Sequence, residues 1–362
     1  ELIDGIRAVR GRLIRKHARA LYARVRIAGM PNLLRRAALL AALTLSLSTF
    51  GTGHALLAAP QAAAPAPAIP ATLTDKEFWG LVDTLSEPAG YFQSDNFVGN
   101  ELTFQYVVPS LRATVKPGGV YMGVGPDQNF TYIAALQPKI AFIVDIRRGN
   151  LLQLLMYKAL IELSADRVDF AAKLFARSRP SIKAGASADE ILNAVYLMAP
   201  DKSVFESTRA AIVSHLTKAH GYPLTAQEIE HLEGIYGMFY SYGPGITYSS
   251  GGNARPGSMP TYWDMQVTDD GRGNAWTYMA SEDLFQGIKR MQHANLIVPV
   301  TGNFANHVVP VTHAFPSPST TTPAAQGSLS SRWPTGWRRA ARTPSSSLLP
   351  TTSGRRARAA RD

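Results

Sequence analysis

The feature that most constrains the fold is the stretch 118–148, where two short apolar runs flank a helical pattern. The runs 119–124 and 140–145 are bounded by glycine, proline or polar residues, as buried parallel strands often are. Between them, residues 127–136 have the apolar spacing of a helix. A strand, a helix and a strand in this order predict a βαβ unit whose two strands lie parallel in one sheet.

Helix starts elsewhere are marked by capping boxes, in which a Ser or Thr and a Glu three residues later satisfy each other's free amides. Boxes that begin at Thr74, Ser187 and Thr225 predict helices over 75–84, 188–198 and 226–238. Other patterns predict a further strand over 296–301 and helices over 151–177, 203–219 and 281–293. The run 151–177 is apolar on more than one face, so we expect it to be buried against the sheet. The predicted class is α/β, with a Rossmann-like, mainly parallel sheet flanked by helices.

The end of the first predicted strand carries the chemistry of a ligand site. Gly123 and Gly125 allow a tight turn and a close approach of the backbone, and the next helix offers free amides at its start. Asp145 lies 20 residues after Gly125, where an acid accepts hydrogen bonds from ribose hydroxyls. Asn129 and Phe130 occupy the area of the third glycine that dinucleotide sites use, which disfavours NAD and FAD. An adenosine-containing ligand without pyrophosphate fits better, and S-adenosylmethionine is the obvious candidate; a βαβ unit without ligand remains open.

Other polar residues near this loop are candidate ligand contacts. Gln128, Asn129 and Tyr132 begin the helix after the glycine loop, and simple helix-start chemistry is an equal interpretation. Arg147 follows the acid and has the chemistry to bind a carboxylate or phosphate. Asn100 and Glu101 precede the first strand, where a covering segment would contact a cofactor; a local turn explains them as well. No catalytic base is assigned.

The stretch around Gly123, Gly125 and Asp145 resembles the glycine loop and ribose acid of class I S-adenosylmethionine-dependent methyltransferases. A broader set of short motifs runs through 74–305, namely LSE at 85–87, GYF at 90–92, SDN at 94–96, GVGPDQNFTY at 123–132, DIRRGN at 145–150 and SADR at 164–167. This set resembles a family of uncharacterised, exported bacterial proteins. The resemblance implies a methyltransferase-like fold with no established reaction. It also implies that 298–305 should continue into a further helix and strands, so we expect a sheet that is incomplete at the C-terminus.

Charge and cysteine content exclude several classes of site. The formal net charge is +11, but the positive charges are concentrated in residues 1–36 and 311–362, and the segment between them is mildly acidic. We therefore expect a small-molecule ligand and no nucleic acid. The chain has no cysteine, which excludes disulfides, thiolate metal sites and a cysteine nucleophile.

Composition also divides the chain into segments. Residues 30–59 have the form of a signal peptide, with Arg35 and Arg36 before the apolar run 37–50. Residues 1–29 are interpreted as a non-native or read-through extension, and 60–72 as a Pro/Ala linker. A Rossmann-like domain is expected over 73–305, followed by a disordered basic tail over 306–362, for which a frameshift is favoured over a natural disordered tail. The expected location is the periplasm or the outside of the cell, with no stable membrane span after signal cleavage.

Histidine spacing gives no indication of a metal site. His215 and His220 are five residues apart rather than four, and the sequence has no HExxH motif. We therefore expect no metal.

The functional hypothesis from the sequence is a methyltransferase-like protein that binds S-adenosylmethionine at the Gly123 and Gly125 loop and Asp145. The alternatives are a non-catalytic exported binding protein that reuses the fold and, less favoured, an NAD-dependent oxidoreductase.

Overall fold

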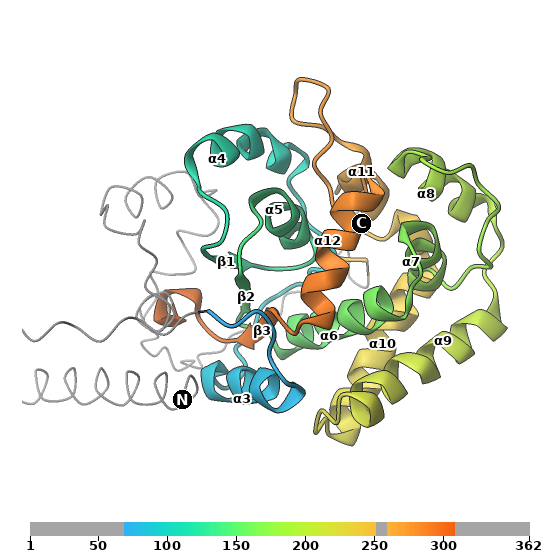
Figure 1. Ribbon diagram of the computed structural model, residues 1–362. Helices are drawn as coiled ribbons and strands as arrows, with labels where there is room; N and C mark the ends of the chain where they lie inside the picture. Colours follow the sequence, from blue (N-terminus) through green and yellow to red (C-terminus); the bar gives the residue numbers. More distant parts are fainter. Residues whose placement is uncertain (1–68, 251–258, 308–362) are drawn as a thin grey trace, which may run out of the picture. The chain divides into compact units, whose positions relative to one another are not determined.

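Three parallel strands form the sheet. The computed structural model describes residues 69–250 and 259–307, and within them the strands pair in the order β1-β2-β3 (Figure 1). They are β1 (Val120–Val124), β2 (Ile140–Asp145) and β3 (Ile297–Thr301). The central strand β2 is buried along its whole length, which accounts for its unbroken apolar run. The α/β class and the parallel sheet are confirmed, and each strand begins within one residue of its predicted start.

Helices pack against the sheet on two sides. α5 (Gln128–Leu136) connects β1 to β2 and packs beside α12 (Glu282–His293), which leads into β3. α3 (Asp75–Leu85) packs against β3 and lies on the other side of the sheet from α5 (Figure 1). α6 (Arg148–Leu163) begins three residues after β2, contacts both β2 and β3, and is buried at every residue from 150 to 162. The prediction that this apolar run is buried is confirmed.

The prediction of one continuous helix over 151–177 is wrong. α6 ends at Leu163, and a separate helix, α7 (Arg167–Leu174), begins after Asp166. The carboxylate of Asp166 accepts hydrogen bonds from the backbone amides of Val168 and Asp169, which is the geometry of an N-cap. Arg179 holds the same carboxylate through two hydrogen bonds of 2.8 and 2.7 Å.

The remaining elements form a helical region beside the sheet. All three predicted capping boxes are present, at Thr74, Ser187 and Thr225. The predicted helix 203–219 begins at Lys202 but changes to a wider π-helical turn at His215. The elements not yet named are η1 (Leu102–Val107), α4 (Val108–Thr114), α8 (Ala188–Leu197), α9 (Lys202–Ser214), η2 (His215–Ala219), α10 (Ala226–Tyr242), η3 (Gly243–Gly245) and α11 (Tyr262–Val267).

Among the described helices, none is long and apolar enough to cross a membrane. Several predicted segments lie outside the described residues. They are the N-terminal extension, the signal peptide, the linker up to residue 68 and the tail from residue 308.

Candidate functional site

The loop after β1 offers open space at one glycine only. Gly125 has a φ of +92°, and no atom lies within 4 Å of where a Cβ would stand. A Cβ on Gly123 would lie 1.9 Å from Oδ1 of Asn129 and 2.6 Å from the hydroxyl of Tyr121. Gly123 therefore makes room for the chain's own side chains, and of the two predicted glycines Gly125 is the one that could face a ligand.

The polar residues at the start of α5 hold this loop in place. The Asn129 amide donates to the carbonyl oxygens of Val124, Gly125 and Pro126, and its Oδ1 accepts a 2.7 Å hydrogen bond from Tyr121. The hydroxyl of Tyr132 donates to the carbonyl of Phe104. These two predicted contacts are therefore occupied by the fold. The third, Gln128, has its side-chain oxygen against Gly99.

The acid at the end of β2 lies where the pattern predicts, but it is already paired. Oδ1 of Asp145 accepts hydrogen bonds from the backbone amide and Nε of Arg147, at 2.9 and 3.1 Å, and Oδ2 accepts from Nη2 at 3.1 Å. Arg147 also donates to the backbone carbonyl of Asp95. Asp145 is buried, so a ribose could reach this carboxylate only by displacing the guanidinium.

A hollow of about 550 Å³ opens beside this pair. It lies between the segment 90–97, the start of α6 and α10, and Asp95, Arg147, Gln153 and His231 are among its lining residues. Its volume falls within the range of roughly 300–1,000 Å³ typical of small-molecule sites. Its place also agrees with the rule that ligands of open α/β sheets bind outside the carboxyl ends of the strands.

Two buried asparagines near the ends of β1 and β2 have a side-chain oxygen with no hydrogen-bond partner among the described residues. Asn150 donates to the carbonyl of Gly125 at 3.2 Å, yet its own Oδ1 has none. Oδ1 of Asn96 is likewise without a partner, and Asn96 is held at a φ of 53°. Buried acceptors of this kind are satisfied by water or by a ligand, so both are candidate ligand contacts that the sequence did not single out.

Tyr248 connects Asn96 with the ion pair. Burial raises the pKa of Tyr248, and the negative charge of Asp145 raises it further. The positive charge of Arg147 and a hydrogen bond with Asn96 lower this pKa in part. Tyr248 therefore lies within electrostatic reach of both Asp145 and Arg147.

Asn100 and Glu101, which were predicted to contact a cofactor, are exposed and lie just before η1. Burial raises the pKa of Tyr132 to about 12, and the charge of Glu101 adds to this shift.

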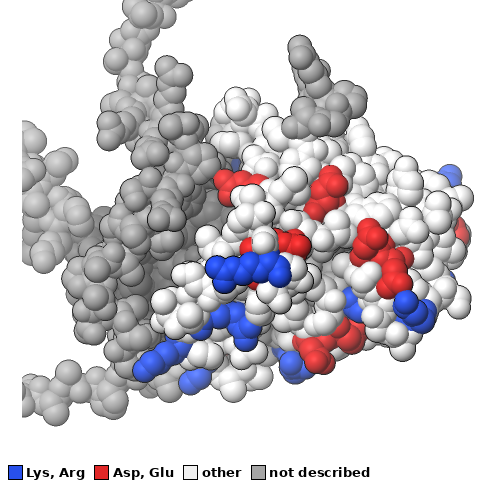
Figure 2. All heavy atoms as spheres, turned by 90° about the horizontal axis from the view of Figure 1, so that it is seen from above, with Lys and Arg blue, Asp and Glu red and all other residues white. Residues whose placement is uncertain are grey.

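Charged side chains on the outer face do not gather by sign. On the face seen from above, acidic and basic side chains are interspersed over the part of the described surface that faces the viewer (Figure 2).

The sequence pattern of one known family, described as Domain of unknown function (DUF7790), matches residues 96–309. The chain belongs to this family. The match includes all three strands, the Asp145–Arg147 pair and both partnerless asparagines, whereas α3 precedes it. No curated protein matches the chain.

The DUF7790 domain holds a buried acid in its glycine loop that sequence reasoning missed. Oδ2 of Asp127 accepts hydrogen bonds from the Tyr278 hydroxyl at 3.0 Å and from the Gln266 amide at 3.3 Å. The Tyr278 hydroxyl is also 2.8 Å from that of Tyr262. Burial raises the pKa of Asp127 to about 7, against the hydrogen bond from Tyr278. The partners come from residues 262–278, so no local pattern could have shown that this acid is buried.

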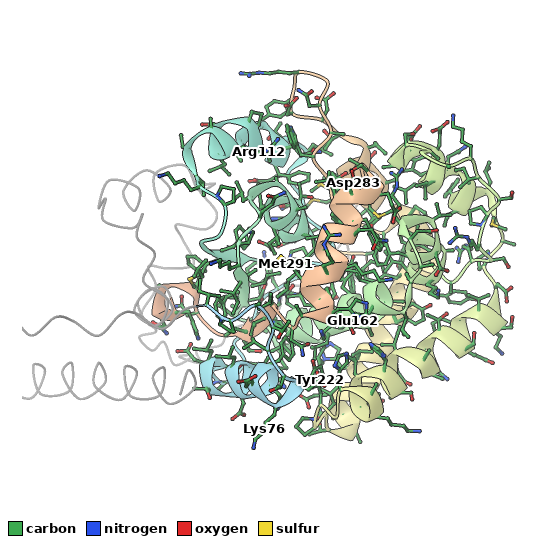
Figure 3. All side chains as sticks on the ribbon, viewed as in Figure 1. Lys76, Arg112, Glu162, Tyr222, Asp283 and Met291 are labelled. Carbon is green, nitrogen blue, oxygen red and sulfur yellow. The ribbon has the colours of Figure 1, made fainter. Side chains whose placement is uncertain are left out.

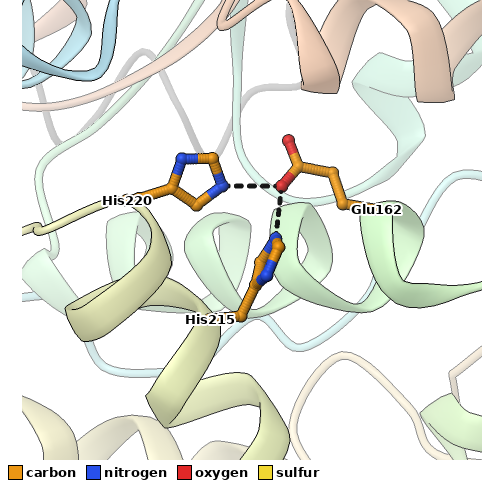
Figure 4. Close-up of side chains that lie close together, drawn as sticks. All are labelled: Glu162, His215 and His220. Carbon is orange, nitrogen blue, oxygen red and sulfur yellow. Dashed lines mark hydrogen bonds and ion pairs between the residues drawn. The ribbon is translucent and has the colours of Figure 1, made fainter.

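The domain also brings His215 and His220 together on one carboxylate, although their spacing in the sequence did not indicate a shared site. Nε2 of His215 lies 2.7 Å and Nε2 of His220 lies 2.8 Å from Oε2 of Glu162 (Figure 4). The spacing of the two histidines in the sequence did not predict this close placement, and the expectation of no metal stays a prediction. The nearby aspartates Asp264 and Asp270 serve a local cap and turn: Asp264 accepts from the Thr261 amide in the capping box of α11, and Asp270 accepts from the amides of Arg272 and Asn274.

Proposed function

We propose that this DUF7790 protein binds an adenosine-containing small molecule at the carboxyl ends of β1 and β2, with S-adenosylmethionine as the best candidate. The observation that carries the proposal is the hollow of about 550 Å³ beside the Asp145–Arg147 pair at the end of β2. A parallel sheet, an open glycine and an acid at the end of the neighbouring strand are the features that adenosine sites in such folds share.

Of the residues proposed to contact the ligand, Arg147 lines the hollow, whereas Gly125, Asp145, Asn96 and Asn150 are not among its lining residues and would be reached once Arg147 moves. Gly125 allows a close approach of the backbone, and Asp145 would accept hydrogen bonds from ribose hydroxyls once Arg147 has moved away. The partnerless oxygens of Asn150 and Asn96 would accept hydrogen bonds from amino groups of the ligand. The freed Arg147, together with the start of the 16-residue helix α6, would attract the ligand's carboxylate.

S-adenosylmethionine would supply an activated methyl group, and the protein's contribution would be to bind and orient it. Methyl transfer is an in-line displacement, in which holding the two reactants in line lowers the barrier. We also propose a location outside the cytoplasm, from the signal peptide expected over 30–59; this location weighs against S-adenosylmethionine, which is a cytoplasmic metabolite.

The Asp145–Arg147 ion pair favours a second candidate function, which is the binding of a small molecule without catalysis. If Arg147 stays on Asp145, the acid is not free for ribose, and the hollow becomes a binding site for a different small molecule without methyl transfer. The protein would then be a non-catalytic binding protein that keeps the fold.

Calorimetric titration of the full chain with S-adenosylmethionine, S-adenosylhomocysteine and NAD separates these functions. We expect binding of the first two in the micromolar range. Asp145→Asn, which keeps the shape of the side chain, should weaken it at least tenfold, or about 1.4 kcal/mol. The matched control is Asp83→Asn on the exposed side of α3, which should bind as the unmodified chain does. Absence of binding by protein with native circular dichroism, or equal binding by Asp145→Asn, would overturn the proposal, and tighter binding of NAD would replace it with the oxidoreductase hypothesis.

A further inference from the structure

A second group of functional side chains lies at the other end of α6. Glu162 is in the last turn of this helix, whereas Arg148 begins it, so the two lie about 21 Å apart along the helix axis. Figure 3 shows Glu162 beside the region where α6, α9 and α3 approach one another, with Tyr222 close to α3. His215 and His220 reach Glu162 from the end of α9 (Figure 4). The group is therefore separate from the hollow at the strand ends.

The π-helical turn is what brings the two histidines together. The backbone amide of His220 donates to the carbonyl of His215 at 3.0 Å, five residues earlier. In a regular α-helix, residues five apart point in directions about 140° apart, so they could not share a ligand. The wider turn reduces this difference, and π-turns of this kind often occur at functional sites.

The three side chains are of the types that bind divalent transition metals in proteins. Their ligand atoms, two imidazole nitrogens and one carboxylate oxygen, all lie within 4.8 Å of one another. A tetrahedral zinc ion with bonds of about 2.0–2.1 Å separates its ligand atoms by roughly 3.4 Å. The two Glu162–His contacts of 2.7 and 2.8 Å would need to widen by about 0.6 Å, which side-chain rotation supplies.

The surroundings hold one ligand ring in the orientation that metal binding requires. Nδ1 of His220 lies 2.6 Å from Oδ1 of Asp75, and the ring stacks on Tyr222 with centroids 4.9 Å apart. Asn295 donates to the same carboxylate oxygen at 3.0 Å and so fixes Asp75. A carboxylate that holds the outer nitrogen of a ligand histidine is a recurrent feature of zinc sites, because it leaves the inner nitrogen facing the metal.

Lys158 sets the charge balance of the group. Its Nζ lies 2.6 Å from Oε1 of Glu162, and both side chains are almost fully buried. Oε1 of Glu162 is thus held by Lys158, and Oε2 is directed at the two imidazoles.

We propose that Glu162, His215 and His220 bind a divalent transition-metal ion, for which Zn²⁺ is the best match. Three protein ligands leave one position of a tetrahedral ion for water or another small ligand, as in zinc sites with Lewis-acid chemistry. His215 and His220 keep 20% and 14% of their side chains exposed, so a metal ion and water can reach the site. The inference does not depend on the proposed function.

The test is calorimetric titration of the chelator-treated full chain with Zn²⁺ alone, together with the visible spectrum after addition of Co²⁺. We expect one ion per chain with micromolar or tighter affinity and the intense bands of tetrahedral Co²⁺. His215→Ala and His220→Ala should each weaken binding at least 100-fold. Asp75→Asn, which leaves the three ligands in place, should weaken it 10- to 100-fold.

Lys218→Ala on the same turn is the matched control, since this exposed side chain is outside the group, and it should leave the affinity unchanged. Glu162→Gln leaves the buried Lys158 without its partner and is expected to unfold, so the histidine variants decide the result. Zn²⁺ affinity that is absent, or that is unchanged in both folded histidine variants, would overturn the proposal. Such a result would leave a structural charge network of Lys158, Glu162, His220 and Asp75.

Discussion

Asp127 shows how much a single buried side chain can determine at the residue scale. Its carboxyl group lies in the glycine loop, yet it is enclosed by Tyr278 and Gln266 from a distant part of the chain. Burial raises the pKa of Asp127 to about 7, so the folded protein favours the protonated acid. The stability that protonated Asp127 contributes to the folded protein is therefore fully present below about pH 4. It is lost as the pH rises through about 7, where the buried carboxyl group ionises.

Asp127→Asn should remove this pH dependence. Between pH 5 and pH 8 we expect the free energy of unfolding of the variant to gain about 2–3 kcal/mol relative to the unmodified chain, because an amide has no charge to bury. Urea unfolding at the two pH values measures the change. A difference between the two proteins that stays constant from pH 5 to pH 8 would show that Asp127 is not a buried acid with a raised pKa.

The sequence predicted where candidate residues lie better than what they contact. Asp145 ends β2 as expected, since the length of a strand–helix–strand unit fixes its position. Its pairing with Arg147, two residues later, was not predicted, because the backbone turn that folds the guanidinium back leaves no mark in the sequence. Asn129 looked like a ligand contact but is occupied by the carbonyl groups of its own loop.

At the scale of elements, helix starts were predictable because capping is local. The boxes at Thr74, Ser187 and Thr225 need only residues three apart, and all three are present. The break between α6 and α7 was missed because apolar residues continue on both sides of it. The π-turn at His215 was missed because a helical pattern does not show a local change of winding.

Asp166 gives a direct test of that break. Asp166→Ala should lower the free energy of unfolding by about 1–2 kcal/mol, because α7 loses its N-cap and Arg179 loses its partner. Asp166→Asn keeps the capping oxygen and should recover most of the lost stability. The control Asp83→Ala, on the exposed side of α3, should change the free energy of unfolding by less than about 0.5 kcal/mol. Thermal and urea unfolding measure all three. Equal stability of Asp166→Ala and the unmodified chain would contradict this role.

At the scale of the whole molecule, α6 joins the two candidate sites. Its first residues border the hollow beside Asp145, and its last turn carries Glu162. The parallel sheet and its three strands followed from short apolar runs, because buried strands need apolar residues on both faces. The convergence of α3, α6 and the end of α9 on Glu162 depends on tertiary packing between residues as far apart as 75 and 220, and no local pattern in the sequence carries it.

The central claim is that the carboxyl ends of β1 and β2 bind an adenosine-containing ligand. Amide hydrogen exchange of the full chain, measured by mass spectrometry with and without saturating S-adenosylhomocysteine, tests it most directly. We predict that exchange slows at least severalfold in peptides covering 123–129 and 145–153, while peptides of α9 (Lys202–Ser214) are unchanged. Exchange that is unaltered at both strand ends, or protection confined to another part of the chain, would contradict the account.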